Sequence, residues 1–178
     1  MTVAGSDLGG SPLRLTADLP VGWKNITWGA VRGDSAPPAG MAFIVSLVDD
    51  TFTDPCTQLR RTPKIGPTVE ALMTALGEIP DTTATKPVKT TLAGHEATSI
   101  EIAIPGSLPC APDHFYLWQD SPGEDWWVQG LNERIHVWVL EVGGRRVAIA
   151  THSYAGSGPA AEAELQKILD SMVFDVAS

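Results

Sequence analysis

IHVWVLEVGGRRVAIATHSYAGSGPAAEAELQKILDSMVF, residues 135–174, is the stretch of sequence that decides the fold. Two apolar runs rich in β-branched residues, 135–142 and 145–154, flank Gly143 and Gly144. A glycine pair accepts the positive φ angles that a two-residue hairpin turn requires. The spacing therefore predicts an antiparallel hairpin in which Val142 lies opposite Arg145.

Both faces of this hairpin are apolar. The predicted register divides its residues into two sets, Trp138, Leu140, Val147 and Ile149 on one face and Val137, Val139, Ala148 and Ala150 on the other. Two apolar faces are typical of strands in the middle of a sheet that is covered on both sides. Residues 158–172 predict one cover, because apolar residues recur there at helical spacing.

Length and charge bound the class of protein. The 178 residues predict a single α+β domain over residues 12–178, after a disordered tail or expression lead at residues 1–11. Twelve basic and 21 acidic residues give a net charge of -9, which opposes binding to nucleic acid and to anionic membranes. No apolar run approaches the roughly 18 residues of a membrane-spanning helix. We expect no transmembrane segment, and an N-terminal signal or anchor that is absent from this chain.

The rest of the chain predicts further strands and one more helix. Apolar or alternating runs predict strands at 26–31, 41–48, 88–92, 96–104 and 115–118. Residues 66–68, Gly-Pro-Thr, predict the start of a helix that ends at Gly77. Trp28 and Trp138 are expected in the core. Residues 119–130 show no such pattern and predict a long mobile loop rich in acidic residues.

Cys56 and Cys110 are the only two cysteines, and each lies beside proline in a turn-like context. A lone pair has one internal connectivity, so a disulfide between them is one interpretation. Two unrelated free thiols are the alternative. A disulfide would indicate an oxidising compartment outside the cytoplasm.

Patterns for metal binding and catalysis are weak in this sequence. The histidines, His95, His114, His136 and His152, show no metal-binding spacing, and the predicted register places His136 and His152 on opposite faces. The acidic turn around residues 49–54 does not match a calcium loop. Ser157 lies between glycines but lacks the full G-x-S-x-G pattern. No metal, cofactor or catalytic residue is predicted.

Tryptophans are the remaining candidates for a site. Trp118, Trp126 and Trp127 gather in the acid-rich region, where exposed aromatic rings are unusual without a reason. One interpretation is a loop that folds back over the sheet and caps its edge. The other is a groove for a ligand or partner, built from these three residues and Tyr154.

Three short motifs resemble the PsbP-like α/β/α sandwich family, and within it secreted or lipid-anchored domains of unknown function from high-GC bacteria. They are LPVGW at 19–23, TLAGHE at 91–96 and ELQKILDSMVF at 164–174, so the likeness spans residues 13–175. Similar domains carry Asp-Pro-Cys, Gly-Pro-Thr and a later cysteine. The resemblance implies an antiparallel sheet flanked by helices, a lipoprotein-like domain and a Cys56–Cys110 disulfide, without catalytic residues to carry over.

These observations favour binding over catalysis. The first hypothesis is a noncatalytic extracytoplasmic domain of a larger anchored protein, which binds a protein partner or a small ligand through the aromatic residues. The second is a secreted hydrolase that uses His114 or His136 with a nearby carboxylate. The third is a carbohydrate-binding or cell-wall-binding module.

Overall fold

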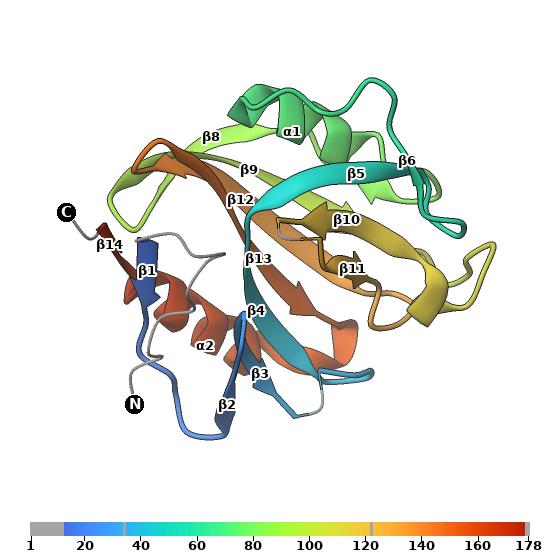
Figure 1. Cartoon of the computed structure of the whole chain (residues 1–178). Coiled ribbons are helices and arrows are strands. Elements are labelled where there is room, and N and C mark those ends of the chain that lie inside the picture. Colours follow the sequence, from blue (N-terminus) through green and yellow to red (C-terminus); the bar gives the residue numbers. More distant parts are fainter. Residues whose placement is uncertain (1–12, 34, 122, 177–178) are drawn as a thin grey trace.

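The computed structural model describes residues 13–33, 35–121 and 123–176, arranged as three antiparallel sheets and two α-helices (Figure 1). The tail predicted at residues 1–11 lies outside the described residues. The large sheet has the spatial order β2 (Trp23–Ile26), β3 (Gly29–Arg32), β4 (Met41–Ser46), β13 (Arg145–Ser153), β12 (Arg134–Val142), β9 (His95–Ala103) and β7 (Thr83–Ala84), and β8 (Val88–Leu92) also pairs with β9.

The predicted hairpin forms the middle of this sheet. In the register of β12 and β13, Val142 lies opposite Arg145, as the sequence predicts. Gly143 and Gly144 have φ angles of 58° and 74°, so both occupy the left-handed region that a primed turn needs. The hairpin is paired on both sides, to β4 through β13 and to β9 through β12.

One helix lies on each face of the large sheet (Figure 1). Helix α2 (Gly158–Asp170) places Leu165, Ile168 and Leu169 in one core together with Trp138 and Ile149. Thr68 caps the N-terminus of helix α1 (Val69–Gly77), whose Leu72, Met73 and Leu76 enter a second core with Val137, Val139, Ala148 and Ala150. The two predicted faces of the hairpin are therefore confirmed, residue by residue.

A second, four-stranded sheet shares the α1 face. Its order is β11 (Asp125–Trp127), β10 (Tyr116–Asp120), β5 (Val48–Asp54) and β6 (Leu59–Arg60), and β1 (Leu13–Thr16) pairs separately with β14 (Val173–Val176). Phe115, Leu117, Trp118 and Val128 pack from this sheet and its flanks onto the α1-side core. The α+β class is confirmed, whereas a helix-flanked sandwich describes the molecule only in part, since much of this face is covered by strands.

Two local predictions are wrong. Residues 119–130 are not one long loop, because β10 and β11 form a hairpin with Gln119 opposite Asp125. The strand predicted at 26–31 is instead a second hairpin, in which Ile26 pairs with Gly29 across a tight turn. Trp28 lies in that turn and is half-buried rather than in the core. In both regions short strands of three or four residues leave too few positions for a period to show.

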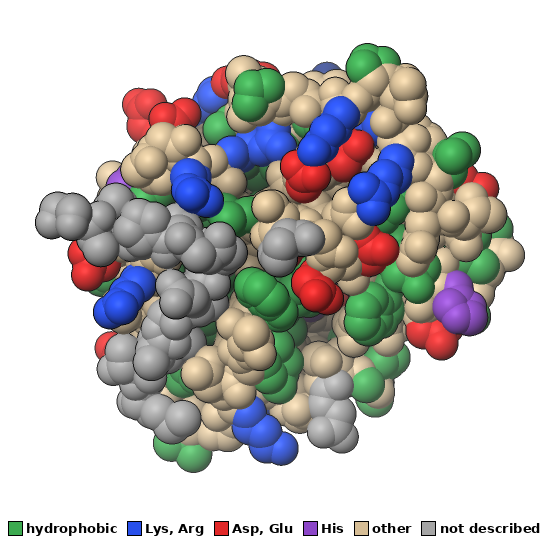
Figure 2. Space-filling model, viewed as in Figure 1, with side chains coloured by type: hydrophobic (Ala, Val, Ile, Leu, Met, Phe, Trp, Pro, Cys, Tyr) green, Lys and Arg blue, Asp and Glu red, His purple; other side chains and the backbone are tan. Residues whose placement is uncertain are grey.

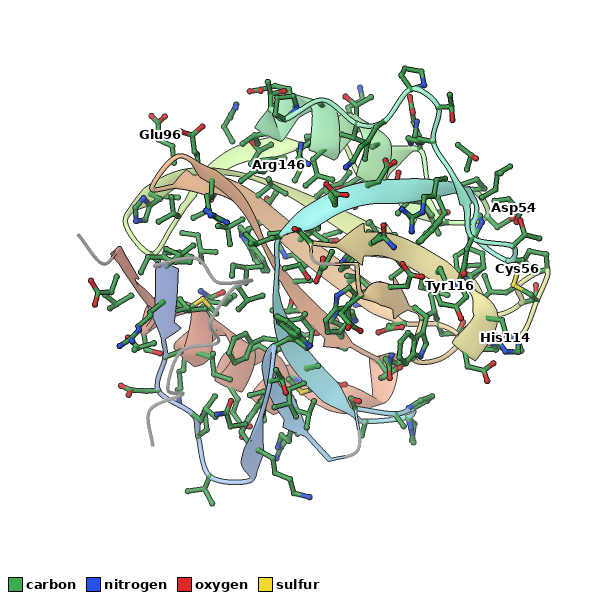
Figure 3. All side chains as sticks on the ribbon, in the orientation of Figure 1. Asp54, Cys56, Glu96, His114, Tyr116 and Arg146 are labelled. Atoms are coloured by element: carbon green, nitrogen blue, oxygen red, sulfur yellow. A yellow bond between two sulfur atoms is a disulfide. The ribbon has the colours of Figure 1, made fainter. Side chains whose placement is uncertain are left out.

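Two long-range links fix the four-stranded sheet to the rest of the molecule. The Sγ atoms of Cys56 and Cys110 lie 2.10 Å apart, at disulfide distance, near Asp54 and His114 (Figure 3). On the opposite side of that sheet the Arg146 guanidinium donates hydrogen bonds to the carbonyl oxygens of Thr68 at 3.0 Å and Val48 at 2.9 Å. It thus joins β13 to the start of α1 and to β5.

Substituting Ala148 by leucine tests the close packing on the α1 side. Ala148 is 1% exposed and belongs to the α1-side core. Extra methyl groups in a filled core force neighbouring side chains off their rotamers, so Ala148→Leu is expected to cost about 1–3 kcal/mol. Urea unfolding measures the change. Ala103→Leu, at an exposed alanine of β9, is the matched control; an equal midpoint for both variants would mean that the face is open.

Candidate functional site

Helix α2 covers only part of its face of the large sheet. It packs over β4 and β13 and leaves a groove over β9 and β12, bounded beyond β9 by β7 and β8. One part of the groove, of about 510 Å³, lies between α2 and β7, and a second part, of about 540 Å³, lies between α2 and the β8–β9 turn. Both parts share His136, Trp138, Gln166 and Leu169, so we treat them as one site, the α2 groove.

One face of α2 forms a wall of the groove. Glu162, Leu165, Gln166, Leu169 and Asp170 line it, and their spacing is that of a single helical face. From the first to the last of these residues the helix rises about 12 Å. The groove is therefore long enough for an extended ligand.

Two stacked rings form the middle of the groove floor. His136 and Trp138 point to the same side of β12, and their ring centroids are 3.7 Å apart with an interplanar angle of 26°. Burial lowers the pKa of His136, and the nearby Glu101 carboxylate opposes that change. Because its ordinary pKa is already near 6.5, the imidazole is mainly uncharged at neutral pH.

The accessible surface of the groove mixes polar groups with apolar carbon, and it is more apolar between α2 and β7 and more polar beside the β8–β9 turn. Trp138, Leu165 and Leu169 contribute to its floor, but each is less than 10% exposed. The exposed or half-exposed lining residues carry hydroxyl, carboxylate, guanidinium or amide groups, or are small: Thr83, Thr90, Ser99, Glu101, Ala103 and Arg134. A ligand in this groove would meet hydrogen-bonding groups around a largely buried apolar base.

The four aromatic residues predicted as a binding groove do not line one surface. Trp118 is 0% exposed in the α1-side core, and Tyr154 is 5% exposed. Trp126 lies opposite Trp118 in the β10–β11 register and packs partly buried against that core. Only Trp127, 42% exposed, presents a large part of its ring to solvent, at an edge-to-face angle of 68° to Tyr116. Trp118, Trp126 and Tyr154 are thus wholly or partly buried, and among the four only Trp127 is exposed.

Trp127 is the exposed member of these four aromatic residues, so its substitution tests their surface without removing a buried side chain. Trp127→Ala is expected to lower the free energy of unfolding by about 1 kcal/mol, the value of one exposed aromatic pair with Tyr116. Thermal unfolding followed by circular dichroism measures it. A loss of folding in Trp127→Ala would show that the ring is a structural part of the β10–β11 hairpin.

His152 and Ser157 have structural partners. His152 and Glu133 form a buried pair, with His152 Nδ1 2.7 Å from a Glu133 carboxylate oxygen. Burial raises the pKa of Tyr154, and the charge of Glu133 raises it further. Ser157 Oγ accepts a hydrogen bond from the Tyr154 backbone N–H, as the third residue of the short 3₁₀ helix Ala155–Ser157, and donates to the Gly40 carbonyl. Within the described ranges no cluster of three or more His, Cys, Asp or Glu side chains could hold a metal.

The sequence contains a partial signal for the α2 groove. Alternation along β9 predicts that Ser99, Glu101 and Ala103 point away from the buried face, and the register places them beside His136 and Trp138. Polar and small residues therefore share a face with a core tryptophan. The hydrophobic pattern of the sequence does not indicate how far α2 extends across that face, because the position of a helix on a sheet depends on packing between residues distant in sequence.

The fold and groove together define an antiparallel α+β domain with a groove beside α2 on one face of its large sheet. Neither a family model nor a curated protein matches this chain. Two solved structures are similar in fold. LpqN of Mycobacterium tuberculosis, described as involved in cell envelope biogenesis, is 11% identical, with a TM-score of 0.49 over 91% of this chain and 83% of that one. Cyanobacterial PsbP (CyanoP) from Synechocystis sp. PCC 6803 is 12% identical, with a TM-score of 0.45 over 99% and 92%. The second of these proteins is a PsbP, the family whose motifs the sequence resembles.

Proposed function

We propose that this protein is a noncatalytic binding domain that works outside the cytoplasm and holds its ligand in the α2 groove. The observation that carries the proposal is the groove that α2 leaves over the part of β9 and β12 that carries Glu101 and His136. Sheets in compact domains normally bury their faces, and concave sites with a few convergent polar groups are the usual places for ligands. The groove replaces the aromatic residues of β10 and β11 as the preferred site, since Trp118 is fully buried.

Location outside the cytoplasm is supported by the cysteine pair. Cys56 and Cys110 lie at disulfide distance, and stable disulfides of this kind form in oxidising compartments. Neither described helix has the length and apolarity needed to cross a membrane. The net charge of -9 makes a neutral or protein ligand more suitable than nucleic acid.

Binding is favoured over hydrolysis by the geometry around His136. Its Nδ1 lies 4.0 Å from the Glu101 carboxylate, beyond hydrogen-bond distance, so the ring is not oriented as a general base usually is. Within the described part of the chain, His136 has no hydrogen bond to a serine or threonine hydroxyl. His114 lies in a short turn near Cys110 and does not line the groove; Figure 3 shows it on the side of the molecule that carries Cys56.

Mapping with small organic probes tests the location of the site. Isopropanol and phenol are added separately to the ¹⁵N-labelled protein, and backbone amide shifts are followed by NMR. We expect the largest shifts at Ser99, Glu101, His136 and Gln166, because small amphiphilic probes collect where a concave surface combines apolar and polar groups. Shifts confined to the surroundings of Trp127 would move the site to the β10–β11 hairpin and contradict the proposal.

A pair of arginine substitutions controls this experiment. Ala103→Arg places a long side chain at the exposed rim of the groove, and Leu59→Arg adds the same charge on β6, where leucine is 60% exposed. The first variant is expected to abolish the probe-induced shifts, and the second to leave them unchanged. Equal behaviour of the two variants would show that the probes do not enter the groove.

A further inference from the structure

Resting on the proposed function, we infer that the ligand of the α2 groove is an uncharged oligosaccharide. Three features of the groove indicate the chemistry of the ligand: its charge, the kind of side chains that remain accessible, and the ring surface at its centre. Each feature excludes or favours a different class of ligand.

Charge argues against an anionic ligand. Three carboxylates, Glu101, Glu162 and Asp170, line the groove against one guanidinium, Arg134. His136 adds little positive charge at neutral pH, because burial lowers its pKa. A phosphate, sulfate or uronate group would therefore enter a negative field, on a protein whose net charge is already -9.

The accessible side chains argue against a lipid chain or an amphipathic helix. Such ligands need exposed aliphatic or aromatic surface to bury. The large hydrophobic residues exposed on the described surface are Val21, Ile26, Leu59, Val88, Trp127 and Val173. None of these residues lines the groove. The apolar surface between α2 and β7 thus comes without a large exposed hydrophobic side chain, so an apolar chain would bury mostly the carbon atoms of small, polar or largely buried residues there.

Sugar hydroxyls match the polar groups of the groove in both hydrogen-bonding directions. Each hydroxyl can donate to the carboxylates of Glu101 and Glu162 and accept from the Arg134 guanidinium or the Gln166 amide. The Gln166 amide nitrogen now donates to Asp170 at 2.7 Å, on the same exposed helical face. That bond is solvent-exposed, so a ligand hydroxyl can take its place at low cost.

The stacked ring pair supplies the apolar complement to those hydroxyls. A sugar ring presents C–H groups between its hydroxyls and packs well against flat ring systems. His136, with 35% of its side chain exposed, lies at the point that both parts of the groove share. The exposed ring surface of His136 thus lies beside the polar residues that α2 contributes to both parts of the groove.

Neutral and anionic trisaccharides test the inference directly. Cellotriose, maltotriose and mannotriose are titrated into the ¹⁵N-labelled protein and compared with trigalacturonic acid. At least one neutral sugar is expected to shift the backbone amide signals of Ser99, His136 and Gln166. The anionic sugar is expected to bind with an affinity lower by a factor of at least about ten. Equal or tighter binding of trigalacturonic acid would overturn the inference.

Two glutamine variants identify the contact. Gln166→Ala removes an exposed amide from the groove wall. It is expected to lower the affinity for the neutral sugar by about three- to tenfold, the value of one lost hydrogen bond. Gln129→Ala, near Trp127 and outside the groove, is the matched control and should bind as the unchanged protein does. If only Gln129→Ala lowers the affinity for the neutral sugar, the site lies at the β10–β11 hairpin and the inference is wrong.

The probe experiment separates this inference from the proposed function. If isopropanol and phenol map to the α2 groove while none of the three neutral trisaccharides does so at millimolar concentration, the sugar inference fails and the binding groove stands. If neither the probes nor the sugars map there, both fail. Sugar shifts that persist in Ala103→Arg would also overturn the inference, because the groove is blocked in that variant.

Discussion

Replacing Cys56 and Cys110 together by alanine is expected to lower the free energy of unfolding by about 4 kcal/mol, the chain-entropy value for a loop of this length. The two residues are separated by 54 positions, so the unfolded chain gains much freedom when the link is removed. Domains of this size are stable by roughly 5–15 kcal/mol, and the loss is therefore a large share of the whole. Urea unfolding of the native and double-alanine proteins measures the difference.

Reduction gives an independent control for the same prediction. A thiol reductant should lower the unfolding midpoint of the native protein to that of the double-alanine variant, and leave the variant itself unchanged. Thiol titration of the unreduced, denatured chain should find no free thiol. Two free thiols, or a midpoint indifferent to reductant, would contradict both the disulfide and the main support for a location outside the cytoplasm.

The central hairpin and both of its faces could be predicted because their causes are local. Gly143 and Gly144 set the turn, the turn sets the register, and the register assigns every side chain of β12 and β13 to a face. The helix at 158–170 follows from apolar spacing in the same way. The β10–β11 hairpin could not be predicted, since its three-residue strand β11 acquires its conformation by pairing with β10.

The candidate site could be predicted only in its components. The same-face relation of His136 and Trp138 follows from alternation along one strand. That Trp118 is buried and Trp127 is exposed does not follow from sequence, because it depends on which face of β10 meets the α1-side core. The groove itself results from the position of α2 on the sheet, which is set by residues as distant as Trp23, whose indole N–H donates to Glu164 at 3.0 Å.

Asp120 is a buried acid whose charge state should affect stability. It lies on β10, is 4% exposed, and accepts a hydrogen bond from the Trp126 indole N–H. Burial raises its pKa from 3.8 to about 7, against the lowering effect of the Trp126 hydrogen bond and the nearby Ser46 hydroxyl, and the charge of Glu124 raises it further. The folded protein therefore binds this proton more tightly than the unfolded chain does.

The free energy of unfolding should fall as pH rises from 3.8, the pKa of Asp120 in the unfolded chain, to about 7, its pKa in the folded protein. Below about pH 4 the carboxyl is protonated in both states and costs nothing; above about pH 7 it is ionised in both, and burying the charge costs roughly 4 kcal/mol. Asp120→Asn keeps an oxygen that accepts from Trp126 and cannot ionise. The variant should match the native protein near pH 4 and exceed its free energy of unfolding by roughly 3–4 kcal/mol at pH 8.

Urea unfolding at several pH values measures this difference, with Asp113→Asn as the control for the loss of one exposed negative charge. The sign of the change in unfolding free energy at pH 8 distinguishes Asp120 from a carboxylate in a stabilising ion pair. Replacing such a carboxylate would destabilise the protein at pH 8 and not at pH 4. A variant less stable than the native protein at pH 8 would mean that the ionised carboxylate is stabilised by its hydrogen bonds more than it is destabilised by burial. Because Trp126 supplies one of those bonds, Trp126→Phe combined with Asp120→Asn then identifies the partner responsible, through the departure of the double variant from additivity.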